Sequence, residues 1–224
     1  MKFSYSWIRE MVGRPEEPLD IPAESLERLI TMKTAECEAI ETTGELLAAA
    51  VPARVEAVEQ IEGGKHVVRA IVKAGKYGLK TVVCGAPNCR AGITTAYVPL
   101  GVKSIAGVLS DGMLASASEL GISRDHAGII ELGPHEELPQ PDRVIDIDNK
   151  SITHRPDLWG HHGMAREVAA ITGKTLRDPV NISLLPEAGS PVKVEIEDLT
   201  LCPRYSALVF ENVTVQPSPL WRQA

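Results

Sequence analysis

Aromatic side chains and long apolar runs are scarce in this chain. Its 224 residues include two Phe, three Trp and four Tyr. No apolar run approaches the roughly 20 residues that a helix needs to cross a bilayer, and Met1–Arg9 lack the basic start and apolar core of a secretion signal. These absences argue against a membrane protein and a secreted protein. They predict a cytoplasmic protein with no membrane partner.

Cysteine is also rare, and its spacing argues against the usual cysteine-based sites. The four cysteines are Cys37, Cys84, Cys89 and Cys202, and no two of them have the C-x2-C spacing of zinc and redox motifs. A structural zinc needs four closely placed ligands. The Cys84 and Cys89 pair therefore predicts buried, reduced thiols rather than a metal site.

An excess of basic charge is absent over the whole chain, whose formal net charge is −7. Residues 50–135 nevertheless carry nine basic and seven acidic side chains. A local cationic face can bind RNA even so, because binding follows the local potential rather than the total charge. A solvated surface of mixed charge would give the same counts, so both interpretations stay open.

Five short strand-like runs, separated by glycine clusters, begin at about residue 48. They cover residues 48–61, 67–72, 81–84, 94–100 and 128–132. Five such runs in fewer than 100 residues predict a small barrel or sandwich, and the five-stranded oligonucleotide-binding (OB) barrel is one example.

Helical patterns lie on both sides of this β-rich part. The first is expected from Pro22 to Met32. The second is expected to begin near Pro156, with Asp157 as its N-cap, and to end at Gly173. Neither helix can form a core alone, so we expect the two to pack together, with the barrel inserted between them in an α+β fold.

The C-terminal part predicts a linker at Pro186–Pro191 and two strands, at residues 192–196 and 206–215. About 34 residues after such a linker are too few to bury a core of their own. We therefore expect the chain to be a piece of a longer protein.

Several strings, in the order of the chain, resemble the β subunit of bacterial phenylalanyl-tRNA synthetase. VVCGAPNCRAG at residues 82–92 and IAGVLSDGMLASASELG at residues 105–121 are similar to its inserted tRNA-binding module. DID at 146–148, THRPD at 153–157 and GMAREVAA at 163–170 resemble the return into its first domain. CPRY at 202–205 and PSPLW at 217–221 resemble the opening of its third domain.

The resemblance implies domain boundaries and partners. A discontinuous N-terminal domain would cover residues 1–45 and 149–188, an OB-fold tRNA-binding domain residues 46–148, and the truncated start of a third domain residues 189–224. The partners would be tRNA, the synthetase α subunit in a heterotetramer, and the remaining β-subunit domains. The parent ligase would use ATP and magnesium to charge tRNA in protein biosynthesis. This chain itself is expected to hold no catalytic residue, cofactor or metal.

The expected tRNA contacts are the cations of the β-rich part. Only Tyr77 and Tyr97 are aromatic in residues 50–135, which favours contacts with RNA backbone and shape over stacking on several bases. One loop departs from the family, since IEGGKHV at 61–67 replaces its His-Pro-x-Ala-Asp-Lys-Leu pattern and puts inherited contacts there in doubt. The candidate contacts are Lys65, Arg69, Lys73, Lys76, Lys80, Arg90 and Lys103.

Two polar segments of the β-rich part predict turns. Asn88 follows Pro87 and is expected to close its own turn rather than to bind a phosphate. Ser110-Asp111-Gly112 is a common turn sequence, so we expect a structural turn rather than a reactive serine.

Polar residues around the second helix also predict structure rather than chemistry. His161 and His162 are adjacent and project about 100° apart on a helix, which disfavours a metal site; one is expected to be packed and the other exposed. A local ion-pair network joining barrel and helix is expected from Arg155, Asp157, Arg166 and Glu167.

Two other functions remain open. One is a protein-interaction scaffold that braces the β subunit and binds little RNA, which the acidic total charge favours. The other is a free-standing hydrolase that uses Cys84 or Ser110.

Overall fold

The computed structural model of the chain describes residues 1–61, 67–184, 193–216 and 218–220. The chain divides into two units, Met1–Arg177 with Ser218–Ala224, and Asp178–Pro217. Lys65 and the expected linker at Pro186–Pro191 lie outside the described residues. None of the helices in the described ranges has the length and apolar character of a bilayer span.

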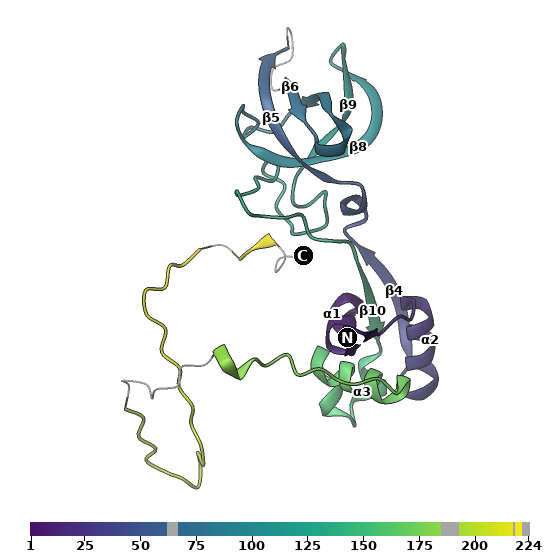
Figure 1. The fold of residues 1–224 in the computed structure, drawn as a ribbon, viewed down its shortest axis with the longest axis vertical. Coiled ribbons are helices and arrows are strands. Elements are labelled where there is room, and N and C mark those ends of the chain that lie inside the picture. Colours follow the sequence, from purple (N-terminus) through teal and green to yellow (C-terminus); the bar gives the residue numbers. More distant parts are fainter. Residues whose placement is uncertain (62–66, 185–192, 217, 221–224) are drawn as a thin grey trace. The chain divides into compact units, whose positions relative to one another are not determined.

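One part of the first unit combines a three-stranded sheet with three helices. The strands pair antiparallel in the order β1-β10-β4. The helices share an apolar core with the sheet that includes Phe3, Ile8, Leu26, Ile145 and Val168. In chain order the elements are β1 (Lys2–Ser4), α1 (Tyr5–Met11), α2 (Ala23–Lys33), β4 (Cys37–Thr43), β10 (Asp142–Ile147) and α3 (His161–Thr172) (Figure 1).

Local sequence accounts for the ends of these helices. Ser4 caps α1, since its hydroxyl accepts a hydrogen bond from the Trp7 amide at 3.1 Å. Pro22 immediately precedes α2, and the negative charge of Glu24 in the first turn interacts favourably with the helix dipole. Gly173 ends α3 with a left-handed φ of 67°. The expected extents of α2 and the stop at Gly173 are confirmed.

The sheet of this part joins segments that are distant in sequence. β10 follows all the strands of the β-rich part, yet it lies between β1 and β4. Asp142 is directly opposite Thr43 in the register of β4 and β10. The chain therefore leaves this sheet and re-enters it at one place.

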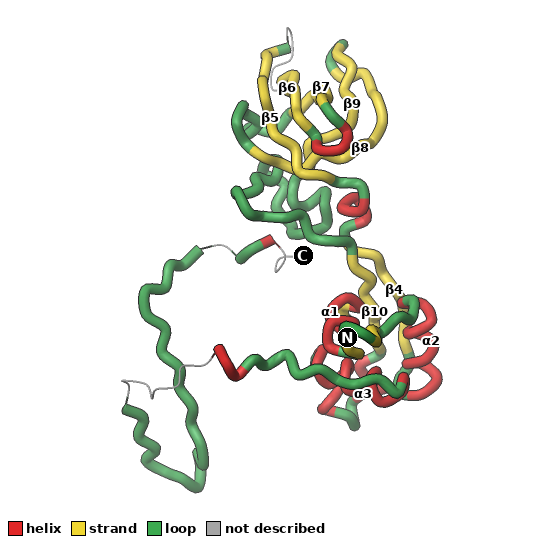
Figure 2. The backbone as a smooth tube through the Cα atoms, in the orientation of Figure 1, coloured by secondary structure: helices red, strands yellow, loops and turns green. Residues whose placement is uncertain are grey.

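The other part of the first unit is a five-stranded antiparallel sheet in the order β7-β6-β5-β8-β9. Its inner face is buried, with Val55, Ala70, Val72, Val82 and Tyr97 all at 0% exposure. Figure 2 shows the strands as one curved sheet. Their bounds are β5 (Val51–Gln60), β6 (Val68–Lys73), β7 (Leu79–Cys84), β8 (Thr94–Ile105) and β9 (Val108–Ala115).

The two edges of this curved sheet are joined by side chains. The Val83 amide of β7 donates a hydrogen bond to the Ser110 hydroxyl of β9 at 3.0 Å. The Lys80 ammonium of β7 lies 2.6 Å from the Asp111 carboxylate of β9. No backbone ladder links β7 to β9 in the described strands, so the sheet is curved without being closed.

The expected fifth strand at residues 128–132 is wrong, because the fifth strand is β9. Residues 128–132 instead cover the outer face of β8 and β9, with amide hydrogen bonds from Ile130 to the Ala115 carbonyl and from Leu132 to the Thr94 carbonyl. The Ile130 and Leu132 side chains bury against Ala96 and its neighbours, whereas Ile129 packs into the core of the inner face. A short apolar run can be buried either as a strand or as an irregular segment that covers a sheet. The apolar pattern of residues 128–132 therefore does not distinguish the two structures.

The turn expected at Ser110-Asp111-Gly112 is also wrong. These residues lie inside β9, and the turn between β8 and β9 is formed by Ala106 and Gly107, both with positive φ. The long ladder that pairs residues 102–105 with residues 108–111 outweighs the local turn preference. Gly112 has a φ of 84° at the irregular step in this ladder.

The second helix begins later than expected. Asp157 lies in a short 3-10 turn, η4 (Pro156–Leu158), and Gly160 is the N-cap of α3. The turn packs so closely on the helix that a Cβ atom at Gly163 would be 1.7 Å from the Asp157 carbonyl oxygen. The role of Asp157 is therefore different from capping α3.

The expected strands at residues 192–196 and 206–215 are not formed in the described residues 193–216. Apolar side chains there are exposed, Leu201 at 86% and Val215 at 95%. A strand needs a partner for its backbone, and these residues have none in the described part of their unit. The remaining short elements are β2 (Gly13–Arg14), β3 (Glu17–Pro18), η1 (Glu45–Ala48), η2 (Gly75–Tyr77), η3 (Asn149–Ile152) and η5 (Ile182–Leu184).

Candidate nucleic-acid interface

Arg69 and Lys73 lie on the outer face of the curved sheet. Both are on β6, where Ala70 and Val72 point to the buried inner face, so Arg69 and Lys73 point outward. Arg69 is directly opposite Glu59 of β5 and forms an ion pair with it. The charge of Arg69 is therefore already balanced within the sheet.

Lys80 occupies a different position, at the mouth of the inner face. It is directly opposite the buried Val72 and forms an ion pair with Asp111 at 2.6 Å. The hydrogen bond to Asp111 raises the pKa of Lys80. The Asp111 carboxylate also accepts a hydrogen bond from the Tyr97 hydroxyl at 3.5 Å. The Lys80 side chain is therefore engaged in a contact that joins β7 to β9.

Arg90 is paired as well, in the loop after β7. Its guanidinium donates two hydrogen bonds of 2.8 Å to the two carboxylate oxygens of Glu131. This contact lowers the pKa of Glu131. Arg90 therefore fastens the covering segment 128–132 to the loop after β7.

Three predicted cations make no ion pair with any described residue. Lys73 is exposed on the outer face of β6. The Lys76 ammonium lies 5.2 Å from the centre of the Tyr77 ring. Lys103 is exposed near the end of β8, in the long hairpin with β9. The structure thus separates the six described candidates into three paired and three unpaired cations, and it does not gather all six into one groove.

Arg54 is a further cation that the candidate set omitted. It is exposed on β5 and lies directly opposite Lys73. The sequence shows Arg54 as one of nine basic residues in this part. Its position opposite Lys73 depends on the register of β5 and β6, which is shifted by an irregularity between Val55 and Ala57.

Asn88 connects two distant segments rather than closing its own turn. Its side-chain amide donates to the Ile129 carbonyl at 2.8 Å and to the Glu131 carboxylate at 3.1 Å. Its side-chain oxygen accepts from the Ile129 amide at 3.0 Å. The expected turn is present, since the Cys89 amide donates to the Ala86 carbonyl at 3.2 Å, but the partners of the Asn88 side chain are more than 40 residues away along the chain. Asn88 pairs with Ile129 as a strand backbone would.

Replacing Asn88 with alanine is expected to destabilise the β-rich part by about 2 to 3 kcal/mol, because the Ile129 amide and carbonyl lose their partners in a half-buried position. The measurement is urea unfolding followed by circular dichroism. Arg90→Ala is the control on the same loop, and the loss of its exposed ion pair should have a much smaller effect. Equal stability of the Asn88 variant and the parent chain would contradict the role of Asn88 as a clamp.

The geometry of Ser110 and Cys84 serves packing rather than hydrolysis. Ser110 is 1% exposed, accepts from the Val83 amide and donates to the Gly112 carbonyl at 3.2 Å. No described histidine hydrogen-bonds to it. Cys84 is 6% exposed, and a hydrogen bond from Cys89 lowers the pKa of Cys84 to about 7. The expected burial is confirmed for Cys84, whereas Cys89 is only partly buried.

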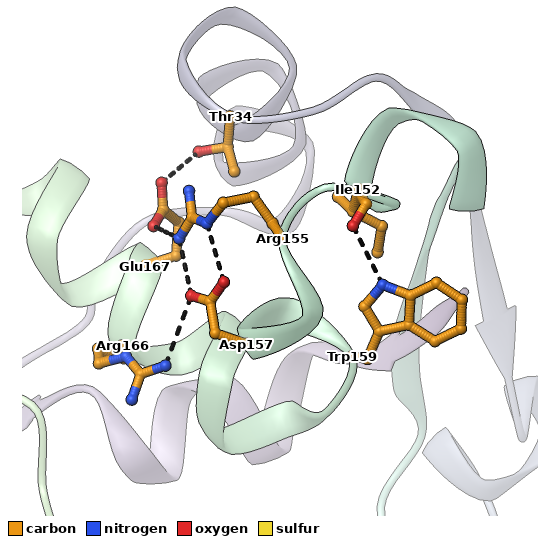
Figure 3. Close-up of polar contacts among 7 residues, drawn as sticks. All are labelled: Thr34, Ile152, Arg155, Asp157, Trp159, Arg166 and Glu167. Atoms are coloured by element: carbon orange, nitrogen blue, oxygen red, sulfur yellow. Dashed lines mark hydrogen bonds and ion pairs between the residues drawn. The ribbon is translucent and has the colours of Figure 1, made fainter.

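The expected ion-pair network forms at the start of α3 (Figure 3). None of its described ion pairs involves a residue of the five-stranded sheet, so it does not join barrel and helix as expected. Arg155 donates to both oxygens of Asp157, at 2.9 and 2.8 Å, and to Glu167 at 2.9 Å. Arg166 lies 3.5 Å from the Asp157 carboxylate. The Thr34 hydroxyl at the end of α2 donates to Glu167 at 3.0 Å. The network therefore joins η4, α3 and α2.

The charges of this network support a structural role. Arg155 lowers the pKa of Asp157 to about 2, so the carboxylate stays ionised at neutral pH. Beside it, the Trp159 indole donates to the Ile152 carbonyl at 3.1 Å (Figure 3). Every charged member of the network has an opposite charge as its partner, which leaves little net potential for a ligand.

The two adjacent histidines differ in the way that the sequence predicted. His161 is half-buried, and its Nε2 accepts a hydrogen bond from the Ser4 amide at 2.9 Å. Its ring centre lies 5.0 Å from that of Trp7. Burial lowers the pKa of His161. His162 is exposed. Within the described ranges, no cluster of three or more His, Cys, Asp or Glu residues could hold a metal ion.

Comparison with known proteins connects this geometry to a family. Residues 51–142 match the family described as "Putative tRNA binding domain". The whole chain is 65% identical to the phenylalanine–tRNA ligase beta subunit of Solibacter usitatus and 38% identical to that of Bradyrhizobium diazoefficiens. The chain spans 29% of the length of each of these two proteins.

A solved structure is also similar to part of the chain. It is the crystal structure of the chaperone CsaA from Bacillus anthracis, with 18% identity over 40% of this chain and 83% of that chain. The TM-score is 0.28, which is too low for an argument about the fold. The sequence matches therefore decide the assignment: the chain is a relative of the phenylalanine–tRNA ligase beta subunits, and it carries a domain of the tRNA-binding family at residues 51–142.

Proposed function

We propose that this chain is the tRNA-docking and assembly region of a phenylalanine–tRNA ligase beta subunit. The observation that carries the proposal is the match of residues 51–142 to the tRNA-binding family, on a sheet with unpaired cations on its surface. Residues 46–141 would form an OB-type domain inserted in a discontinuous domain of residues 1–45 and 142–188. The boundary expected at residue 148 moves to residue 142, because β10 (Asp142–Ile147) belongs to the sheet of the discontinuous domain. The pairing of β10 with both β1 and β4 supports this insertion.

The catalytic work of the proposed ligase would lie outside this chain. Residues 189–224 would begin the next domain of the subunit. An alpha subunit in a cytoplasmic heterotetramer, with ATP and magnesium, would complete the aminoacylating enzyme. In this proposal the present chain contributes substrate docking, with no catalytic residue, cofactor or metal of its own.

The contact with tRNA is proposed to be weak, electrostatic and independent of sequence. Three of the six described candidates are used in ion pairs, which leaves Lys73, Lys76 and Lys103 for phosphates. Tyr97 is fully buried and Tyr77 is half-buried, so neither offers a free face on which several bases could stack. Discrimination between tRNAs is therefore left to the rest of the enzyme.

A salt series tests this function. Binding of tRNA to the 224-residue chain is expected to weaken roughly 15- to 60-fold between about 50 and 200 mM salt, because about three phosphate contacts release about three counterions. Fluorescence anisotropy with labelled tRNA measures the affinity, and an unrelated tRNA is the control. We expect both tRNAs to bind alike. Absence of binding at the lowest salt would overturn the docking role.

A scaffold that braces the beta subunit and binds little RNA is the second candidate function. The observation that favours it is the pairing of Arg69, Lys80 and Arg90 with carboxylates, which removes half of the described candidate cations from RNA binding. The salt series separates the two functions, since a scaffold predicts no salt-dependent affinity for tRNA.

A further inference from the structure

Two outward cross-strand pairs on β5 and β6 have opposite electrostatic character. Glu59 and Arg69 are directly opposite each other and form an ion pair. Arg54 and Lys73 are also directly opposite each other, at the other end of the same two strands. Their neighbours Val55 and Val72 are both at 0% exposure on the inner face, so Arg54 and Lys73 project together from the outer face.

The pair of Arg54 and Lys73 places two like charges side by side without a counter-charge. Side chains directly opposite on an antiparallel pair have Cβ atoms about 4.5 to 5.5 Å apart, and like charges there are destabilising. No described carboxylate forms an ion pair with either residue. Glu56 is exposed on β5 only two residues from Arg54, yet it pairs with neither cation. The arrangement is that of a site whose anionic partner comes from outside the chain.

A third cation comes from the turn that follows β6. Lys76 lies in η2, and a Cβ atom at Gly75 of this turn would be 3.8 Å from the Pro52 carbonyl and 3.9 Å from Val51. The turn therefore lies against the start of β5, at the end of the strand pair that carries Arg54 and Lys73. β5, β6 and η2 thus bring three unpaired cations to one end of the sheet.

We infer that Arg54, Lys73 and Lys76 form a binding site for the phosphodiester backbone of RNA. This inference rests on the proposed function and adds to it the place and the chemistry of the contact. The guanidinium of Arg54 can donate two hydrogen bonds to one phosphate, while the two lysines act as mobile point charges beside it. Phosphate contacts position a nucleic acid and do not read its sequence.

The test uses three variants that each lose one positive charge. Two of the substitutions, at Lys73 and Arg69, lie on the same face of β6, and the third, at Arg54, lies on β5. Lys73→Gln is expected to weaken tRNA binding about 3- to 10-fold at low salt and to lower the salt slope by about one. Arg54→Gln should act in the same direction. Arg69→Gln is the matched control, because the charge of Arg69 is balanced by Glu59; its affinity should stay within about twofold of the parent chain.

Folding is monitored in parallel by thermal unfolding. Lys73→Gln removes a like-charge pair, so its Tm is expected to equal or exceed that of the parent chain. One contrary result is that the parent chain binds tRNA in a salt-dependent way while all three variants bind with the same affinity. That result would overturn the proposed phosphate site and leave the proposed function standing.

A second probe separates the site from the proposed function if the parent chain does not bind tRNA. Tripolyphosphate is then titrated while the backbone amide resonances of residues 53–55 and 72–77 are followed by NMR. Shifts that Lys73→Gln abolishes would support a polyanion site although the docking function had failed. No shifts with the parent chain would overturn the site as well.

Discussion

Gly163→Ala is expected to lower the free energy of unfolding of the first unit by about 2 to 4 kcal/mol. The new Cβ atom would lie 1.7 Å from the Asp157 carbonyl oxygen and 2.8 Å from its carbon. Alanine in a helix normally gains about 1 kcal/mol over glycine. Here the clash outweighs this gain, because ion pairs to Arg155 and Arg166 hold Asp157 in place.

The measurement is urea unfolding followed by helical circular dichroism. Gly160→Ala is the control in the same segment, since Gly160 has extended backbone and no atom within 4 Å of its Cβ position. Its cost should stay at about 1 kcal/mol or less, the effect of an N-cap change. A Gly163 variant as stable as the Gly160 variant would show that η4 does not pack on α3 as closely as described.

Gly112→Ala is expected to destabilise the β-rich part by about 3 kcal/mol, from two sources. Gly112 has a φ of 84°, which costs a residue with a Cβ atom about 1 to 2 kcal/mol. The Cβ atom would also lie 2.6 Å from the Tyr97 ring and from the Val98 carbonyl oxygen. Tyr97 is fully buried, so displacing its ring would disturb the packing of the inner core.

A second glycine of the same hairpin separates these two sources. Gly107 has a φ of 77° and no atom within 4 Å of its Cβ position. Gly107→Ala therefore measures the backbone strain alone, and it should cost about 1 to 2 kcal/mol. Thermal unfolding of both variants gives the comparison. Equal losses would rule out a contribution from the contact between Gly112 and Tyr97.

The sequence predicts the elements that local signals define and misses those that depend on distant partners. The periodic apolar residues of α2 and the stop at Gly173 are local, and both predictions are confirmed. The sequence does not predict α1, because a helix of seven residues has too short an apolar pattern. It does not predict β1, β4 and β10 either. Phe3 and Ile145 are fully buried because β1 pairs with β10, across more than 140 residues of chain.

The candidate interface shows the same division. Composition identifies the cations, whereas their partners depend on register and tertiary contact. Arg69 is balanced because Glu59 is directly opposite, and Arg90 because Glu131 returns to it from 41 residues away. No local pattern around either arginine announces these pairs, so the sequence could not separate the paired cations from the free ones.

The position of Thr43 opposite Asp142 has a consequence for the history and engineering of this chain. Two residues that face each other on paired strands are the ends of a hairpin, whatever length of chain connects them. The entropy of closing such a connection grows only with the logarithm of its length, by about 0.6 kcal/mol for each doubling. The domain inserted between β4 and β10 can therefore be exchanged for another domain at little thermodynamic cost to the three-stranded sheet. The same holds if a tight turn replaces the inserted domain.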